Sequence, residues 1–281
     1  MSEIILRKYH GVGNDYLIFD PKKNDVVLNE RLIRQLCRRN IGVGADGILY
    51  GPVMEDKKIK VRIFNPDGSE AEKSGNGIRI FSRYLKDAGY VKERQYYLTT
   101  KAGETLVTFL DDAGSCMRVD MGYAVFEAEQ IPALGFEGEV VGESIFFCDN
   151  FYNATCVSMG NPHAIVYLDK NVDLKAFELE KIGPMFENHP AFPDRVNTEF
   201  IQVVDRKNLN MRVWERGSGE TLACGTGACA SLVATVLNGM CDDEATLHLL
   251  GGDLKINWDR ENNTVYLEGP AVTICTGEID E

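Results

Sequence analysis

A short glycine-rich turn that occurs twice is the feature that most constrains the fold of this chain. The segments EKSGNGIRIF and LACGTGACAS hold Ser74 and Cys224 about 150 residues apart. Both read as a hydroxyl or thiol, a glycine, a polar residue and a second glycine, and both precede residues with helical periodicity. Their surroundings, GSEAEKSGNG and GSGETLACGTG, align with one inserted residue. The repeat favours two similar lobes, each with one principal helix headed by the turn.

The patterns of most other segments predict β-strands rather than helices. The strand-like runs are rich in β-branched and aromatic residues and are bounded by Gly, Asn, Asp or Pro. They are LIFD, GILY, KVRIF, YYLTT, TLVTFL, CMRVDM, SIFFCDN, TCVSMG, HAIVYL, EFIQVV, NMRVW, LHLL, LKINW, TVYLEG and VTICTG.

Three segments have helical periodicity. One runs from Leu28 to Arg39, with Asn29 as its candidate N-cap. A second follows Ser74 and ends before Gly89, and a third follows Cys224 and ends at Gly239. The third is apolar on nearly all sides, which predicts that it is buried. The segment 124–142 has the weakest pattern and is interpreted as a linker between the two halves.

Length, charge and cysteine usage exclude several classes of protein. The 281 residues contain no apolar run long enough to span a bilayer, and the N-terminus does not resemble a signal peptide. The net charge of −13, without a basic run, disfavours nucleic acid as a partner.

The scattered cysteines predict reduced, mostly buried thiols in a cytoplasmic protein. No metal site is expected, because no cysteine–histidine spacing fits zinc. The cysteines are Cys37, Cys116, Cys148, Cys156, Cys224, Cys229, Cys241 and Cys275.

One glycine motif does not indicate a cofactor. GVGADG, residues 42–47, matches the dinucleotide pattern GxGxxG, but it follows a predicted helix and precedes a predicted strand. A dinucleotide site needs the reverse order, so we interpret the segment as a helix-to-strand turn. No P-loop is present, and no cofactor is expected.

The chemistry expected of the repeated turn is anion binding and thiol activation. The start of a helix exposes N–H groups and a partial positive charge, which bind carboxylates and lower the pKa of a thiol placed there. Cys224 is therefore a candidate reactive thiol, and Glu215 and Arg216 just upstream add an acid–base group and a cation. The alternative, an inert structural cysteine in a glycine-rich turn, stays open on these grounds.

Read together, the motifs resemble the pyridoxal-independent diaminopimelate epimerase family. The segments that carry this resemblance are KYHGVGNDYLIFD, RRNIGVGADG, RIFNPDGSEAEKSGNGIR, SMGNPHAIVYLD, FPDRVNTEF and WERGSGETLACGTGACA. The resemblance implies an α/β (α+β) fold of two pseudo-symmetric lobes, each a curved, mostly antiparallel sheet wrapped around a central helix. The expected lobes are residues 1–122, with 269–281 returning to them, and residues 123–268. It also implies an active site in the cleft between the two helix N-termini.

The resemblance further implies an epimerase that inverts an amino-acid α-carbon, converting LL- to meso-diaminopimelate in lysine and peptidoglycan-precursor biosynthesis. Inversion through a carbanion needs an acid and a base on opposite faces of the carbon, which explains why the turn occurs twice. The implied catalytic residues are Cys224, Ser74, His163 and Glu215. The implied substrate-binding residues are Asn14, Asn65, Gly75, Asn76, Asn161, Asn197, Glu215, Arg216, Gly225 and Thr226. Taken singly, each polar residue could instead be an ordinary turn, hydrogen-bonding or surface residue.

The chain departs from the family pattern at Ser74, where the family has its other catalytic cysteine. A hydroxyl holds its proton far more tightly than a thiol, so Ser74 is a poor base and weak turnover is expected. Two interpretations stay open, an introduced substitution and a natural variant.

The alternatives in function are a racemase of another amino acid, such as histidine, and a catalytically impaired amino-acid-binding homologue. The expected partner is a small amino acid. A homodimer is compatible with the sequence, which does not fix the oligomeric state.

Overall fold

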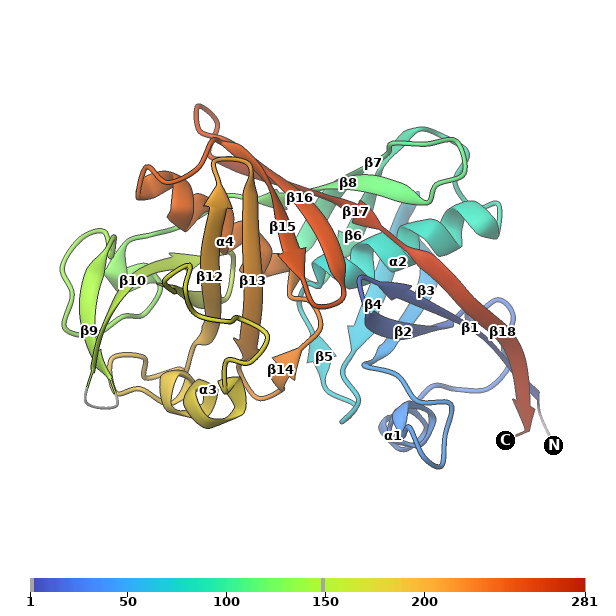
Figure 1. Cartoon of the computed structure of the whole chain (residues 1–281). Helices are drawn as coiled ribbons and strands as arrows, with labels where there is room; N and C mark the ends of the chain where they lie inside the picture. Colours follow the sequence, from blue (N-terminus) through green and yellow to red (C-terminus); the bar gives the residue numbers. More distant parts are fainter. Residues whose placement is uncertain (1–2, 148–149, 281) are drawn as a thin grey trace. The chain divides into compact units, whose positions relative to one another are not determined.

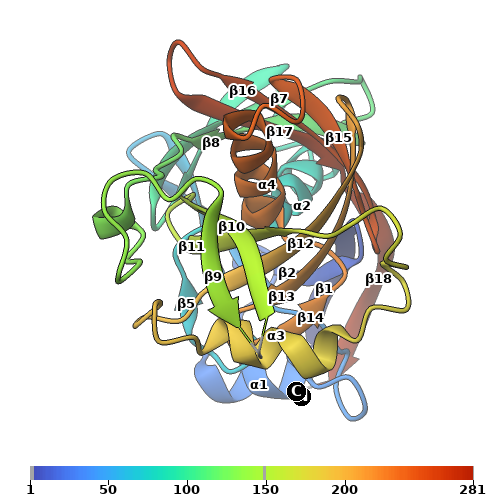
Figure 2. The same cartoon turned by 60° about the vertical axis from the view of Figure 1, so that its left-hand side comes forward.

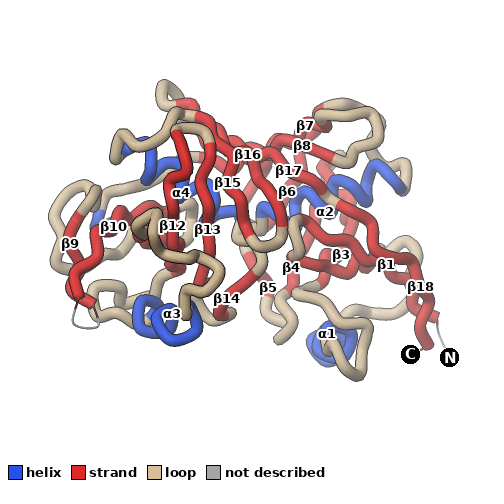
Figure 3. The backbone as a smooth tube through the Cα atoms, in the orientation of Figure 1, coloured by secondary structure: helices blue, strands red, loops and turns tan. Residues whose placement is uncertain are grey.

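The structure, a computed structural model, describes residues 3–147 and 150–280 and divides into two compact units (Figure 1). The first unit comprises Met1–Asp120 and Glu268–Glu281, and the second comprises Met121–Leu267. Both combine many strands with few helices, which confirms the predicted mixed α and β class; strands dominate the trace in Figure 3. Among the described residues, no helix is long and apolar enough to cross a membrane.

The described residues of the first unit form two helices and a set of strands that ends with β18. β18 pairs antiparallel with β1, so the described ends of the chain lie side by side (Figure 1). The elements are β1 (Glu3–Gly11), β2 (Asn14–Phe19), α1 (Glu30–Cys37), β3 (Ile48–Glu55), β4 (Lys58–Phe64), β5 (Glu70–Ala71), α2 (Gly75–Asp87), β6 (Gln95–Thr100), β7 (Gly103–Phe109), β8 (Cys116–Gly122, whose last two residues belong to the second unit) and β18 (Val272–Asp280).

The second unit has the same kind of construction. Its helix α4 packs on β10, β11, β12, β15 and β16, and Figure 2 shows it beside the first of these strands. The elements are η1 (Ala128–Gln130), β9 (Glu143–Phe147), β10 (Asn150–Ser158), β11 (Pro162–Tyr167), α3 (Leu179–Glu187), β12 (Asn197–Asp205), β13 (Asn208–Glu215), β14 (Gly219–Thr221), α4 (Gly225–Leu237), β15 (Glu244–Leu249), β16 (Gly252–Asp259) and β17 (Thr264–Pro270, whose last residues belong to the first unit).

Most strand pairs within each unit are antiparallel, and the parallel ones occur where a helix connects two strands. α1 connects the parallel strands β2 and β3, and α2 lies between the parallel strands β4 and β6. In the second unit, α3 connects β11 and β12, and α4 lies between β13 and β15. A parallel pair needs a crossover connection, and a helix is the usual one. The helices therefore occupy the same place in the chain order of both units.

The two copies of the internal repeat correspond more closely in the structure than in the sequence alignment. Phe64 pairs with Glu70 in the strands before α2, and Trp214 pairs with Glu220 in the strands before α4. The same number of residues separates the two members of each pair, so neither copy of the repeat has an inserted residue. An equivalent bidentate ion pair joins the two strands in each copy, between Arg62 and Glu70 in the first and between Arg212 and Glu220 in the second. The predicted one-residue insertion between the two copies is therefore wrong, because strand pairing rather than the glycine positions sets the alignment.

The three predicted helices are present; the first spans Glu30–Cys37 rather than Leu28–Arg39, and the third ends at Leu237 rather than Gly239. The side chains of Asn29, Ser74 and Cys224 each accept a hydrogen bond from a backbone N–H in the first turn of α1, α2 and α4. Gly89 and Gly239 follow α2 and α4 with φ values of 75° and 70°, a left-handed conformation that glycine adopts readily. Almost every residue of α4 is buried, as its apolar composition predicts.

The structure corrects the expected linker. Within residues 124–142 the side chains of Ala128, Ile131, Ala133 and Val140 are buried in an apolar cluster of the second unit. The segment is thus part of that unit's core. Its apolar residues are irregularly spaced because it forms a short 3-10 turn and loops, so it shows neither strand nor helix periodicity.

The cysteines follow their prediction in part. Five of them are buried among the described residues: Cys37, Cys156, Cys224, Cys229 and Cys241. Cys116 is half-buried and Cys275 is exposed, while Cys148 lies outside the described residues.

Helix α3 was not predicted, because Gly183 and Pro184 interrupt its pattern. A side chain at Gly183 would bring its Cβ to 2.3 Å from the Trp214 ring, so glycine is required for the helix to pack on β13.

We expect Gly183→Ala to lower the free energy of unfolding by about 1–3 kcal/mol through overpacking, although alanine is normally the better helix former. Urea denaturation measures this, with Gly277→Ala as control because nothing lies within 4 Å of that position. Equal stability of the two variants would show that the helix can shift away from the ring.

Candidate functional site

The first group of predicted site residues gathers at the start of α2. Ser74 caps this helix, and its Oγ accepts a hydrogen bond of 3.0 Å from the N–H of Gly77. The hydroxyl of Tyr16 donates to the same oxygen at 3.4 Å. The hydroxyl of Ser74 is therefore held by the cap and by Tyr16. We call Asn14, Ser74, Gly75 and Asn76 the first half-site.

Asn14 and Asn76 of the first half-site contact each other through their amides. The amide of Asn76 donates to Oδ1 of Asn14 at 3.1 Å, and Asn14 in turn donates to Asp46. Arg79, which is fully buried on α2, donates to Oδ1 of Asn76 at 2.8 Å and to the carbonyl of Gly75. A buried guanidinium directly behind the first turn adds positive charge to that of the helix N-terminus.

Asn65 lies apart from the hydrogen bonds of the first half-site. It begins the turn between β4 and β5, and its side-chain amide donates to the hydroxyl of Ser69 at 3.0 Å. The backbone of Asn65 also bonds to Ser69. These contacts give Asn65 a structural role in the turn, and its predicted contact with substrate stays a prediction.

The second group of predicted residues gathers at the start of α4. Cys224 caps this helix, and its Sγ accepts a hydrogen bond of 3.4 Å from the N–H of Gly227. The hydroxyl of Thr226 lies 3.5 Å from the same sulfur. Only 5% of the surface of Cys224 is exposed. We call Asn161, His163, Asn197, Glu215, Arg216, Cys224, Gly225 and Thr226 the second half-site.

Glu215 lies at the end of β13 and is the carboxyl group next to the thiol. It accepts a hydrogen bond from the hydroxyl of Thr221 at 2.5 Å, and it lies close enough to Cys224 for the two groups to affect each other's pKa. Burial raises the pKa of Glu215 above its ordinary value, and the interactions with Thr221 and Cys224 act in the opposite direction. A carboxyl group with a raised pKa can hold or release a proton nearer neutral pH, as acid–base catalysts do.

His163 reaches the thiol through two intermediate side chains. Its Nε2 lies 3.1 Å from Oδ1 of Asn161, and the amide of Asn161 donates to the hydroxyl of Thr226 at 3.3 Å. Thr226 then contacts Cys224. The ring of His163 is fully buried. Its position in this chain of polar contacts explains how it could influence the thiol without touching it.

Asn197 and Arg216 complete the second half-site from its other side. The amide of Asn197 donates to the carbonyl of Pro162 at 2.8 Å, and its Oδ1 accepts from the backbone N–H of Arg216 at 2.9 Å. The guanidinium of Arg216 donates to the carbonyl of Asp194. These bonds hold the start of β12 and the residue that follows β13 in place.

The structure contradicts one expectation for the thiol. Burial, together with the nearby carboxylates of Glu215 and Glu199, raises the pKa of Cys224 well above its ordinary value. The hydrogen bonds from Thr226 and from the N–H of Gly227 at the helix start lower the pKa of Cys224, but by less than burial and the two carboxylates raise it. The prediction of a lowered pKa was therefore wrong, because the sequence shows the helix start but not the burial or the second carboxylate.

Glu199 and Arg79 are the functional candidates that the sequence analysis missed. Glu199 lies on β12, is fully buried, and places Oε1 2.7 Å from Nδ1 of His163. The available signal was an acidic residue at the start of the apolar run EFIQVV, where a strand buried on both faces rarely has a charge. Arg79 gave no such signal, because an arginine on a helix is usually exposed.

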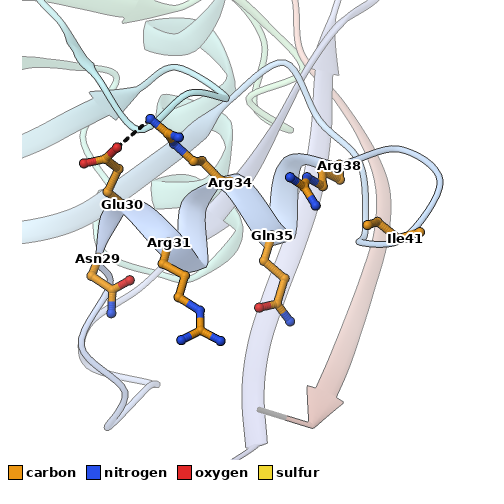
Figure 4. A pocket seen from close by; sticks show the side chains of 7 residues that line it. All are labelled: Asn29, Glu30, Arg31, Arg34, Gln35, Arg38 and Ile41. Carbon is orange, nitrogen blue, oxygen red and sulfur yellow. Dashed lines mark ion pairs between the residues drawn. The ribbon is translucent and has the colours of Figure 1, made fainter.

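A surface hollow on the first unit contains none of the predicted site residues. Among residues 3–147 and 150–280, no group of three His, Cys, Asp or Glu side chains is placed to hold a metal ion. A hollow of about 800 Å³ lies along the outer face of α1, where Figure 4 shows the ion pair of Glu30 with Arg34. It contains none of the predicted site residues and is lined by Asn29, Glu30, Arg31, Arg34, Gln35, Arg38 and Ile41.

Comparison with known proteins extends over nearly the whole chain. The family described as "Diaminopimelate epimerase" matches residues 6–127 and 155–274. The diaminopimelate epimerase of Acetivibrio thermocellus is 46% identical over 275 residues, which cover 97% of each chain. That of Methanococcus maripaludis strain C6 is 44% identical over 97% of this chain and 98% of its own. A hydroxyproline epimerase structure from Agrobacterium vitis superposes with a TM-score of 0.72 over 99% and 94% of the two chains, at 14% identity, and so shares the fold.

Proposed function

Because the chain belongs to the diaminopimelate epimerase family, we propose that it inverts an α-carbon of diaminopimelate, interconverting the LL and meso isomers without a cofactor. The observation that carries this proposal is the second half-site. It combines a thiol at a helix start, a carboxyl group close enough to raise the pKa of that thiol, and a buried imidazole connected to it through Asn161 and Thr226. Proton transfer at a weakly acidic carbon requires such a group.

In the proposed reaction, the thiolate of Cys224 takes the α-proton and the electron pair remains on carbon, delocalised into the adjacent carboxylate. Glu215 passes the thiol proton to solvent beforehand. The thiol formed when Cys224 takes the α-proton exchanges that proton with solvent through Glu215 and then delivers a proton back to the carbanion, which restores the thiolate. The backbone N–H groups at the start of α4, next to Gly225 and Thr226, bind the substrate carboxylate and stabilise its growing negative charge. Gly75 and Asn76 at the start of α2 do the same from the first half-site.

The first half-site supplies the second proton-transfer group, at Ser74. Inversion needs a proton delivered to the face opposite the one from which it was removed. A serine hydroxyl can donate to a carbanion, but it is a poor base at neutral pH because it holds its own proton tightly. We therefore propose that proton exchange through Cys224 is faster than inversion in this chain.

The substrate's second amino-acid end is assigned to three polar side chains of the second half-site and to Asn65. Asn161, Asn197 and Arg216 offer amide and guanidinium groups, and we assign Asn65 to the same task. A carboxylate and an ammonium group at the distal end would use such donors and acceptors. This favours diaminopimelate over amino acids with a neutral side chain.

An amino-acid panel in D₂O tests the proposal. We expect the α-proton NMR signal of LL- or meso-diaminopimelate to disappear in the presence of the protein, while L-lysine, L-histidine and L-proline keep theirs. Exchange with histidine or proline but not with diaminopimelate would show that the assigned substrate is wrong. Binding of diaminopimelate without exchange of either isomer would show that the chain is a binding protein rather than an enzyme.

A further inference from the structure

Tyr16 is the side chain whose hydroxyl lies next to that of Ser74. The two oxygens are 3.4 Å apart, and the hydrogen bonds of catalytic groups often tighten from such distances when substrate binds. Tyr16 is buried, and a Cβ added to Gly47 would lie 2.7 Å from Cε1 of its ring. Close packing of the ring therefore keeps the hydroxyl of Tyr16 within reach of Ser74, although the sequence analysis assigned Tyr16 no role.

The strand registers show that Tyr16 has the same place in the first unit as His163 has in the second. In each unit, a series of paired strand residues leads to the position four residues before the helix cap, Ser74 or Cys224. In the first unit the series is Leu17, Ile48, Phe64 and Glu70. In the second it is Ala164, Thr198, Trp214 and Glu220. Tyr16 directly precedes the first series and His163 directly precedes the second, so the two side chains are equivalent in the repeat.

The residue beneath the first turn of the helix differs between the two units. A Cβ added to Gly227 would lie 2.3 Å from Oε1 of Glu199, whereas one added to Gly77 would lie 3.2 Å from Cδ2 of Leu49. Leu49 and Glu199 are equivalent, since each is the next strand residue after the second member of its series. The first unit thus has an apolar contact beneath its helix start where the second has a carboxyl group.

The two equivalent rings are also connected to their cap residues differently. His163 reaches the sulfur of Cys224 only through two intermediate side chains. The hydroxyl of Tyr16 lies against the hydroxyl of Ser74 itself. An alkyl hydroxyl gives up its proton far less readily than a thiol does and depends on an adjacent group for activation. A phenol is more acidic than an alkyl alcohol, so it can return a proton to a serine oxygen that has lost one.

We propose that Tyr16 is a positioning residue that orients the hydroxyl of Ser74 and returns a proton to it during inversion, an inference that rests on the proposed function. Ser74 donates its proton to the carbanion, whose electron pair forms the new C–H bond. The electrons of the broken O–H bond stay on Oγ, and the hydroxyl of Tyr16 then gives its proton to that oxygen. The tyrosinate takes a proton from water. The same steps in reverse remove the α-proton of the other isomer.

Removal of the Tyr16 hydroxyl tests the proposal. We expect Tyr16→Phe, which keeps the ring, to lower the rate of inversion between LL- and meso-diaminopimelate by about 10–100-fold, less than the loss of a group that touches the reacting carbon. Chiral chromatography measures inversion, NMR measures α-proton exchange on the same samples, and the ratio of inversion to exchange should fall. Tyr96→Phe is the matched control, because the hydroxyl of Tyr96 donates to Ser82 on the same helix at 2.7 Å. The control should leave the ratio as it is.

A second background separates proton return from a structural role. In Ser74→Cys the introduced thiol exchanges its own proton, so adding Tyr16→Phe should change the inversion rate by less than about twofold. A hydroxyl needed only for packing or for the helix cap would cause the same fold-change in both backgrounds. That result would overturn the inference, whatever the size of the change.

The outcomes distinguish the inference from the proposed function. If the unsubstituted protein exchanges and inverts diaminopimelate and Tyr16→Phe inverts it equally fast, the function stands and the inference is wrong. If the unsubstituted protein exchanges the α-proton but inverts no faster than Ser74→Ala, Ser74 transfers no proton, and the inference is again wrong. If neither isomer exchanges its α-proton in any variant, the proposed function is overturned and this inference with it.

Discussion

Replacement of Cys224 by alanine is expected to lower the rate of α-proton exchange on diaminopimelate by about 10²–10⁴-fold, the contribution typical of a general acid or base. The thiol is the group at the start of α4 that can carry the α-proton, because Cys224 caps the helix and His163 reaches it only through Asn161 and Thr226. The exchange rate in D₂O, followed by NMR, measures the effect. Cys229→Ala is the control, because Cys229 is a fully buried thiol on the same helix.

The pH dependence of the unsubstituted protein gives an independent check on the same thiol. Burial and the two carboxylates raise the pKa of Cys224 well above its ordinary value, so the thiol is protonated at neutral pH. The active form is the thiolate, and its fraction rises with pH until the pKa is passed. We therefore expect the exchange rate to increase steadily between pH 7 and 9. A rate that levels off near pH 7 would mean that the thiolate already forms there, contrary to this account.

Replacement of Ser74 by cysteine is expected to raise the rate of inversion between LL- and meso-diaminopimelate by about 10²–10⁴-fold, because it supplies the second acid–base group. The change keeps the N-cap, since Oγ of Ser74 accepts from Gly77 and the sulfur of Cys224 accepts from Gly227 in the equivalent turn. The interconversion of the two isomers, followed by chiral chromatography, measures it.

Two control variants isolate the cause of that increase. Ser74→Ala removes the hydroxyl and should leave inversion as slow as in the unsubstituted protein or slower. Ser82→Cys makes the same chemical change at a buried position further along α2 and should not accelerate inversion. If Ser74→Cys inverts no faster than the unsubstituted chain, position 74 does not have the role assigned to it.

The local features of the fold could be predicted because short-range physics determines them. Asn29, Ser74 and Cys224 are N-caps, and Gly89 ends a helix, because each satisfies backbone groups within a few residues. β1 was not predicted, because a register shift between Lys8 and Tyr9 breaks the alternation of its buried side chains. Its residues Ile4, Leu6 and Tyr9 are buried, so the spacing changes from two to three partway along the strand.

The parts of the candidate site that escaped prediction depend on contacts between distant segments. The pKa of Cys224 follows from burial and from Glu199, 25 positions before it in the chain, while the sequence shows only the helix start that acts the other way. Gly183 looks like a helix breaker until Trp214 is seen packed against it. The family motifs contain the residues of both half-sites, but they did not show that Glu199 contacts His163.

The most direct test of the central claim, proton transfer through Cys224 with Ser74 as a poor second group, compares the two isomers separately in D₂O. The account predicts that only one of LL- and meso-diaminopimelate takes up deuterium at its α-carbon, with its configuration kept and at a rate well above that of inversion. Equal deuterium uptake from both isomers, each accompanied by inversion at the same rate, would contradict it.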